Sequence, residues 1–208
     1  MKKWIFPTFL FLFSFASGSE AQERTTLETC FITMPDALLP QLDVNARKDL
    51  LDLHKAGRAA SVKGRMGNIT LERLDEKTLL LSLSEKSTMQ IALLPAKSSP
   101  VVAVVQTVKM PAADSRIDFY DTGWTARDAA SLLTPPRPED FFVGSRQEKA
   151  DAAQSLPLLP MEYRISGDTL YVEQHLQDFL PEDAYKQVVT HLNTDPIAYR
   201  WNGRRFVK

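Results

Sequence analysis

The stretch from Thr78 to Leu94, which reads TLLLSLSEKSTMQIALL, decides the fold class of this chain. Leucines alternate with polar residues before the break Glu85-Lys86-Ser87. After that break, Met89, Ile91 and Leu93 alternate with polar residues in the same way. A period of two is typical of half-buried β-strands, and a short polar break between two such runs indicates a turn. The stretch therefore predicts two antiparallel strands joined as a hairpin.

The same period continues on both sides of this stretch, over residues 66–121. Polar breaks at 75–77 and at 111–114 separate further apolar runs. Short connections favour pairing between neighbouring strands, so the simplest topology is an antiparallel meander of about five strands. Val101–Val105 is apolar throughout, and we expect it to be the most deeply buried strand.

Two further hairpins are predicted beyond residue 160. A Gly167-Asp168 turn places Tyr163 and Ile165 on the same face as Leu170 and Val172.

The second of these hairpins has its turn at Asn202-Gly203, a dipeptide that favours a tight two-residue turn. Such a turn places Tyr199 and Phe206 on one face. It also places Trp201 beside Arg204, where the two side chains can form a cation–π pair.

Helices are predicted at both ends of the chain. In the first, Leu27, Cys30, Phe31 and Met34 share one face, and Pro35 ends it. A second helix starts near Asn45 as its cap and stops at Gly57, which completes a helical hairpin. Another helix opens at Pro181, carries Ala184, Val188 and Leu192 at intervals of four, and ends near Asn193.

These elements predict an α+β fold, a predominantly antiparallel β-sheet of meander and hairpins with a few helices packed on one face or end. Residues 22–208 are expected to form a single globular domain. The alternative is two sequential helix-plus-sheet halves, about 22–122 and 161–208, joined by the Pro-rich connection 123–160. Within that connection, short helices are expected around 126–133 and 139–142.

Residues 1–21 read as a secretory signal peptide that is removed. Lys2 and Lys3 precede the apolar run Ile5–Ala16, and Ser19-Glu20-Ala21 supplies the small residues of a cleavage site. The run is shorter than the roughly 20 residues that span a membrane. Because Cys30 lies well beyond this run, lipid attachment is not expected either, and the sequence predicts an exported protein without a stable membrane anchor.

Charge and composition narrow the choice of partners. The 25 basic and 26 acidic residues are mixed along the chain and give a formal net charge of −1. Without a basic stripe, a nucleic-acid partner is not expected. The single cysteine allows no internal disulfide, and its apolar helical face predicts a buried, inert thiol.

No pattern in the sequence points to catalysis, a metal or a cofactor. His54, His175 and His191 are widely separated, and none belongs to a metal-ligand motif. The chain contains no GxSxG nucleophile elbow and no Gly-rich phosphate loop. The sequence therefore predicts no catalytic residue, no metal site and no cofactor.

The better candidates for ligand binding are Tyr120, Trp124, Trp201 and Arg204. Tyr120 and Trp124 flank a short polar segment at a strand end, and aromatic side chains at such positions can grip a sugar or a protein strand. We prefer the other interpretation, in which these aromatic side chains cover the core of the sheet.

Four separated patterns carry a family resemblance. They are Phe31–Asp36 with Leu38-Leu39-Pro40, Asp114-Ser115 with Phe119-Tyr120 and Trp124, Glu139–Phe142, and Tyr199–Gly203 with Phe206. In these patterns the chain resembles an uncharacterised family of secreted Bacteroidales proteins, catalogued as a domain of unknown function. The resemblance implies the envelope of a Gram-negative bacterium, with the periplasm as the expected location and the extracellular space as the alternative. It supplies no activity or site residue.

The resemblance also suggests a modification. Envelope proteins of these bacteria carry O-linked glycans on Asp-Ser/Thr followed by an apolar residue, and Asp168-Thr169-Leu170 fits that pattern. Thr169, at a predicted hairpin turn, is therefore a candidate for O-glycosylation.

The leading functional hypothesis is a non-catalytic secreted or periplasmic interaction or binding module that acts on an envelope protein or glycan. The alternative is an envelope hydrolase whose site is assembled only in three dimensions, with His175 or His191 beside an acid. A third hypothesis is a scaffold for an envelope assembly, for which we expect a broad apolar patch instead of a concave pocket.

Overall fold

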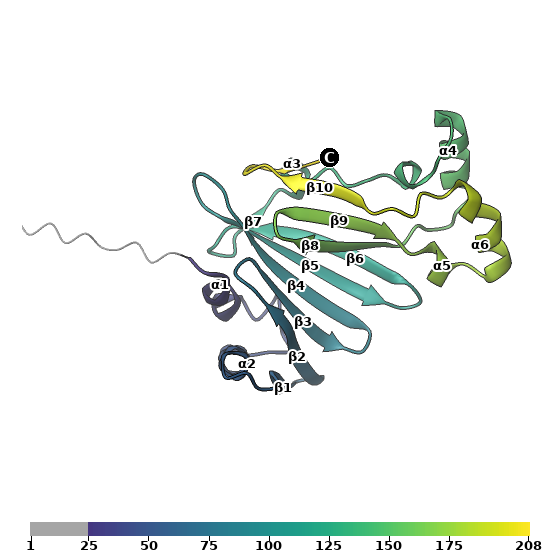
Figure 1. Ribbon diagram of the computed structural model, residues 1–208. Helices are drawn as coiled ribbons and strands as arrows, with labels where there is room; N and C mark the ends of the chain where they lie inside the picture. Colours follow the sequence, from purple (N-terminus) through teal and green to yellow (C-terminus); the bar gives the residue numbers. More distant parts are fainter. Residues whose placement is uncertain (1–24) are drawn as a thin grey trace, which may run out of the picture.

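The computed structural model describes residues 25–208, which form two antiparallel sheets and six helices (Figure 1). One sheet has seven strands in the order β1-β2-β3-β4-β5-β6-β7, and the other has four in the order β11-β10-β9-β8. The α+β fold class predicted from the sequence is confirmed. The predicted signal peptide, residues 1–21, lies outside the described residues.

The strands of the larger sheet are β1 (Ser61–Gly64), β2 (Gly67–Leu74), β3 (Thr78–Ser84), β4 (Ser87–Leu94), β5 (Val101–Lys109), β6 (Ala113–Tyr120) and β7 (Ala126–Arg127). Those of the smaller sheet are β8 (Met161–Ser166), β9 (Thr169–Gln174), β10 (Ile197–Trp201) and β11 (Phe206–Val207). The helices are α1 (Leu27–Thr33), α2 (Val44–Lys55), α3 (Ala129–Leu132), α4 (Arg146–Gln154), α5 (Leu176–Phe179) and α6 (Glu182–Val188), with 3-10 turns η1 (Pro138–Phe141) and η2 (Val189–His191).

The predicted meander is confirmed and is longer than expected. β2 to β6 are the five expected strands, and the short strands β1 and β7 add one to each edge. Val101–Val105 is buried at every position, as its uninterrupted apolar sequence predicted. β5 reaches that burial because it pairs with β4 and β6 on its two sides and is covered on both faces.

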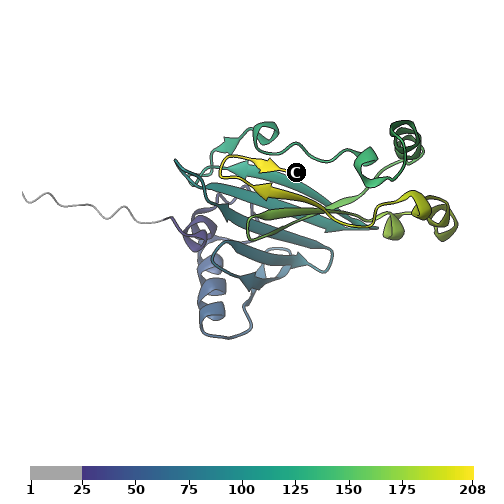
Figure 2. The ribbon, with the colours of Figure 1, turned by 45° about the horizontal axis from the view of Figure 1, so that its top comes forward.

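Two different layers cover the faces of the larger sheet (Figures 1 and 2). On one face, Met89 and Ile91 share a core with α1 and α2. On the other face, Ala92 and Leu94 share a second core with the smaller sheet. The alternation of β4 suggested one buried face and one polar face. In the structure both faces of β4 are buried. The smaller sheet covers the polar side, where Gln90 is only 5 % exposed.

The helical hairpin predicted before the meander is confirmed, with a different start for its second helix. α2 is capped by Asp43, whose carboxylate accepts hydrogen bonds from the amides of Asn45 and Ala46 at 3.0 and 2.9 Å. Asn45, predicted as the cap, is instead the second residue of the helix. Asp and Asn cap helices about equally well, so residue type alone does not separate the two positions. Gly57 follows the helix with φ +66°, as predicted.

Two helices in the second half differ from the prediction. α4, which was not predicted, starts at a capping box in which Ser145 and Glu148 exchange hydrogen bonds with each other's backbone. Because α4 buries no residue fully, it has no apolar periodicity to detect. The helix after Pro181 ends at Val188 and continues as the η2 turn.

The hairpin β8–β9 has the predicted register, with Tyr163 opposite Val172 and Ile165 opposite Leu170, and all four side chains are buried. Its outer strand docks on the larger sheet by hydrogen bonds. The buried amide of Gln90 donates to the carbonyl of Ile165 at 2.7 Å and accepts from the Ile165 amide at 2.9 Å. These bonds satisfy backbone groups of β8 that have no strand partner within the smaller sheet.

Side chains of β6 complete this docking. The hydroxyl of Ser115 accepts a hydrogen bond from the Tyr163 amide at 3.0 Å, and the carboxylate of Asp114 accepts one from the Met161 amide at 3.0 Å. On the outer edge of β8, the backbone amide of every second residue therefore donates a hydrogen bond to a side chain of the larger sheet. This pairing closes an edge that would otherwise be free to pair with another strand.

We expect Gln90→Leu to lower the free energy of unfolding by about 3 kcal/mol, because it leaves the buried amide and carbonyl of Ile165 without partners. Urea unfolding followed by far-UV circular dichroism measures the change. Gln106→Leu is the matched control, because Gln106 is half-buried on the neighbouring strand β5. Equal losses in the two variants would contradict the docking role of Gln90.

Candidate functional site

A basic cavity lies where the β4–β5 loop, the β7–α3 segment and the β10–β11 loop meet. Its volume is about 630 Å³, and its charged lining residues are Lys97, Arg127, Arg204 and Arg205. We call this cavity the basic groove. Its other lining residues include no aspartate or glutamate. Within residues 25–208, none of the four cations forms a salt bridge. The nearby Asp121 carboxylate offsets part of the charge of Arg127, and the four cations leave the groove with net positive charge.

Trp201 fixes the two loops of the groove to each other. Its indole Nε1–H donates a hydrogen bond of 2.6 Å to the carbonyl of Pro95, at the start of the β4–β5 loop. Its ring packs edge-on against Phe206 at 5.1 Å, and it is only 6 % exposed. A partly buried indole needs such a partner for its N–H. Trp201, predicted as a ligand-binding residue, does not line the groove. It instead holds together the two loops that form the groove wall.

The β10–β11 loop has four residues instead of the predicted two. Trp201 pairs with Phe206, not with Arg204, so the prediction that Trp201 and Arg204 share a hairpin face is wrong. The side chain of Asn202 causes the difference, because its Oδ1 accepts from the amides of Arg204 and Arg205 at 3.0 and 2.9 Å. The predicted common face of Tyr199 and Phe206 holds, since both side chains are buried.

This loop directs its two arginines into the groove. The guanidinium of Arg205 donates to the hydroxyl of Thr134 at 2.9 Å, which anchors it across from the hairpin. Arg204 has no such anchor and is exposed. One arginine is thus held in place and its neighbour is free to contact a ligand.

Tyr120 and Trp124, the other predicted binding residues, do not line the basic groove. They pack on each other with ring centroids 5.4 Å apart, and the indole N–H of Trp124 points to the hydroxyl of Thr33 in α1. Burial raises the pKa of Tyr120, and the nearby Asp118 adds to the effect. The structure places this pair beside α1, and a role for it in binding stays a prediction.

Thr169, the predicted glycosylation site, is the first residue of β9 and is half-buried. Its neighbour Asp168 pairs with Lys77 at 2.8 Å, which joins the β8–β9 turn to the β2–β3 turn. Glycosylation of Thr169 stays a prediction.

The histidines named for the hydrolase alternative lie on separate elements. His175 lies between Glu162 and Asp178, with ring nitrogens 3.2 Å from each carboxylate. His175 lines none of five cavities found within residues 25–208. His191 is exposed in η2. Within the same range, no group of three or more acidic, histidine or cysteine side chains is arranged to hold a metal ion.

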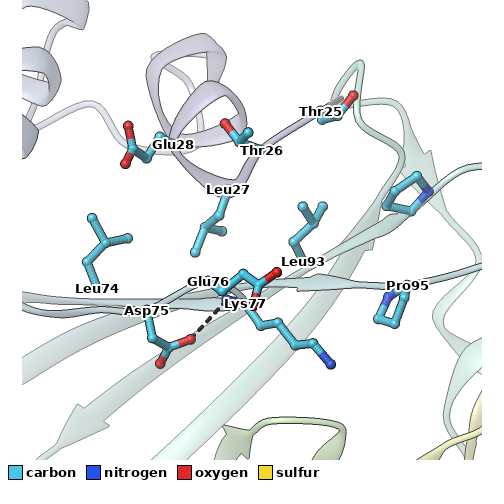
Figure 3. Close-up of a pocket in the computed structure, with 11 residues that line it drawn as sticks. Thr25, Thr26, Leu27, Glu28, Leu74, Asp75, Glu76, Lys77, Leu93 and Pro95 are labelled. Atoms are coloured by element: carbon cyan, nitrogen blue, oxygen red, sulfur yellow. Dashed lines mark hydrogen bonds between the residues drawn. The ribbon is translucent and has the colours of Figure 1, made fainter. Parts of the chain in front are cut away.

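A second, more apolar cavity of about 440 Å³ lies between α1 and the β2–β3 turn (Figure 3). Leu27, Leu74 and Leu93 form its apolar part. Asp75 at its rim is committed to the turn, where it accepts bonds from the amides of Lys77 and Thr78. Burial opposes ionisation of Asp75, but these bonds and that from the Thr78 hydroxyl outweigh it and lower the pKa. The rim of this cavity carries both acidic and basic side chains, so its charge favours neither an anionic nor a cationic ligand.

Cys30 offers no nucleophile. It lies in α1, is 1 % exposed, and burial raises the pKa of its thiol to about 11. The sequence-based interpretation of an inert buried thiol agrees with this environment.

Sequence reasoning identified Arg204 but missed Lys97, Arg127 and Arg205. The adjacent pair Arg204-Arg205 is visible as a local cluster. Lys97 and Arg127 are far from that pair in sequence, and only the packing of the β10–β11 loop against the meander brings them to it.

Comparison with known proteins places the chain in a family. Residues 18–206 match a family model described as Protein of unknown function (DUF3256). The chain belongs to this family. A solved structure of a domain of an uncharacterized protein from Porphyromonas gingivalis W83 is similar to it, with a TM-score of 0.76 and 33% sequence identity. The match covers 87% of this chain and 96% of that one. No curated protein matches.

These findings confirm the predicted resemblance to a domain of unknown function with a Bacteroidales relative. Secretion of this DUF3256 protein stays a prediction. No helix within residues 25–208 is long and apolar enough to cross a membrane.

We expect Trp201→Phe to lower the free energy of unfolding by about 1–2 kcal/mol, because the partly buried carbonyl of Pro95 loses its donor. Trp124→Phe is the matched comparison. We expect a smaller loss there, because the Trp124 indole nitrogen lies 3.4 Å from the Thr33 hydroxyl oxygen and the hydrogen bond is weaker. Urea unfolding followed by far-UV circular dichroism measures both. A larger loss in Trp124→Phe would contradict the wall-supporting role of Trp201.

The raised pKa of the Cys30 thiol predicts that the free energy of unfolding depends on pH. Its pKa is raised from 9.0 to about 11 in the folded protein. The folded state therefore favours the neutral thiol, and this stabilisation is complete below pH 9 and is lost as the pH rises to about 11. We expect the stability advantage of the wild type over Cys30→Ala to shrink across this range in urea titrations. An advantage that stays constant or grows would contradict the burial of a neutral thiol.

Proposed function

We propose that this DUF3256 protein is a non-catalytic binding module of the bacterial cell envelope, and that its basic groove binds a glycan bearing carboxylate or phosphate groups. The observation that carries the proposal is the convergence of Lys97, Arg127, Arg204 and Arg205 on one cavity without an acidic lining residue. These cations come from three separate segments of the chain, so the fold assembles the charge.

The chemistry of the groove suits an anion. Arginine guanidinium groups donate paired, charge-assisted hydrogen bonds to carboxylate or phosphate oxygens. The whole chain has a formal net charge of −1, so the positive groove is a local feature and not the consequence of a basic protein. A cavity of about 630 Å³ is also within the usual size range of ligand pockets.

The lining favours a glycan over a protein partner. Protein interfaces rely on exposed aromatic or aliphatic anchors at their centre. In the basic groove, Val101 and Leu132 are buried, and Ser98, Ser131 and Asn202 supply polar groups. Hydroxyl and amide groups of this kind are suited to hydrogen bonds with sugar hydroxyls.

The proposed location follows from the signal peptide expected at residues 1–21, which directs the chain out of the cytoplasm. The absence of catalysis is proposed because the groove lining, among the described residues, includes no histidine or carboxylate that could act as a general base and activate Ser98 or Ser131 as a nucleophile.

The test is isothermal titration with polygalacturonate and with neutral dextran of similar length. We expect wild-type protein to bind the acidic polymer, with an affinity that falls as salt is added, and not the neutral one. The double variant Arg204→Glu/Arg205→Glu should lose at least about tenfold in affinity, since each lost charge-assisted hydrogen bond costs about 1.5–3 kcal/mol.

The double variant Arg65→Glu/Arg146→Glu is the matched control, because it makes the same charge change at two exposed positions, in the β1–β2 turn and in α4, outside the groove. Its affinity for polygalacturonate should stay at the wild-type level. Equal losses in the control and the groove variant would show that the overall charge, and not the basic groove, determines binding.

A further inference from the structure

A third cavity lies next to the basic groove, and Arg205 lines both. Its volume is about 550 Å³, and its charged lining residues are Arg137, Asp140, Arg205 and Lys208. We call it the distal cavity. It shares Arg205 with the basic groove. The two cavities are therefore neighbours that meet at one side chain.

The same two chain segments line both cavities. Residues 131–137 pass from the basic groove into the distal cavity along one side, and residues 202–208 do so along the other. The Arg205 guanidinium crosses between these segments to the hydroxyl of Thr134 at 2.9 Å. The two cavities are thus adjacent, with the contact between Arg205 and Thr134 at their junction.

The distal cavity has its own cations. Arg137 and Lys208 line it in addition to Arg205. Its one acidic side chain, that of Asp140, already has partners, because its carboxylate accepts a hydrogen bond from the Arg137 amide at 3.0 Å and lies 3.7 Å from the Lys208 ammonium. Burial raises the pKa of Tyr199 to about 12, so its phenol adds no negative charge at neutral pH.

The distal cavity also has an apolar surface. Tyr199 and Phe206 are buried beneath it, and the exposed residues Pro135 and Val207 form part of its wall. The carbon-bound hydrogens of a sugar ring can pack against such a surface while neighbouring cations bind its acidic substituents. This combination suits a sugar residue that carries a carboxylate or phosphate.

We propose that the basic groove and the distal cavity together bind one linear acidic polysaccharide, whose successive anionic groups contact the cations on the two sides of Arg205. This inference rests on the proposed function of the basic groove and extends it from an acidic glycan to an acidic sugar chain. A single acidic sugar engages one cavity at a time. A chain that spans both gains the second set of contacts without a second loss of overall translational freedom, so affinity rises with chain length.

The test measures the affinity of oligogalacturonates of one, two, four and eight units by isothermal titration. We expect wild-type affinity to rise with length by about tenfold or more, as expected for linked binding sites. Arg137→Ala should lower the affinity for the eight-unit chain several-fold and leave that for the single unit unchanged. Val207→Glu, which adds an acid to the distal cavity at an exposed strand position, should do the same.

Arg146→Ala is the matched control and should follow the wild type at every length. Thermal unfolding of each variant checks that it is folded before its affinities are compared. A length-selective loss in both distal variants supports the two-cavity track.

Four outcomes overturn the inference. Affinity that is independent of length restricts binding to one cavity and leaves the proposed function intact. An equal loss at every length in the distal variants shows a general effect of charge and not a second set of contacts for longer chains. Failure of wild-type protein to bind any acidic oligosaccharide overturns the proposed function as well. Equal affinity for a single-stranded oligonucleotide of matched charge shows general polyanion binding and overturns the assignment to a sugar chain.

Discussion

The buried amide of Gln90 connects the two sheets on which the rest of the structure depends. It satisfies the amide and the carbonyl of Ile165, two groups on the outer edge of β8. Apolar contact between two sheet faces is not directional and tolerates sliding, whereas two hydrogen bonds to one residue set a register. Ser115 and Asp114 repeat the arrangement along the same strand. The smaller sheet is therefore held at one position on the meander, and its loops follow.

The basic groove is a consequence of that position. β10 pairs with β9 in the smaller sheet, and Trp201 at the end of β10 reaches the carbonyl of Pro95 in the β4–β5 loop. Asn202 then folds the next residues into a loop that turns Arg204 and Arg205 toward Lys97 and Arg127. Like charges repel one another, so the folded state tolerates this cluster only where surface exposure screens it. Because these cations repel one another and have no salt-bridge partner among the described residues, the groove is a candidate site for an anionic ligand.

The fold also separates the side chains that were candidates for catalysis. Cys30 and the three histidines belong to elements that face different parts of the molecule, and Cys30 is enclosed in the core between α1, α2 and the meander. His175 has two carboxylate neighbours, yet it stands at the junction of β9 and α5, outside the cavities described above. The groove offers positive charge and hydrogen-bond donors, which are groups suited to binding an anionic ligand.

The sequence by itself determined the local structure of this DUF3256 protein: the period of two over 66–121, the buried run Val101–Val105, the turn at Gly167-Asp168 and the helical hairpin before them. Each depends on side chains and backbone within a few residues, which a sequence displays directly. Tertiary structure alone decided which layer covers the polar side of β4, how Asn202 shapes its loop, and which cations meet at Arg205. These depend on contacts between residues far apart in the chain, such as Gln90 with Ile165 and Trp201 with Pro95. Local periodicity contains no information about such partners, because the free energy that selects them comes from burial and hydrogen bonds formed only when the two sheets dock.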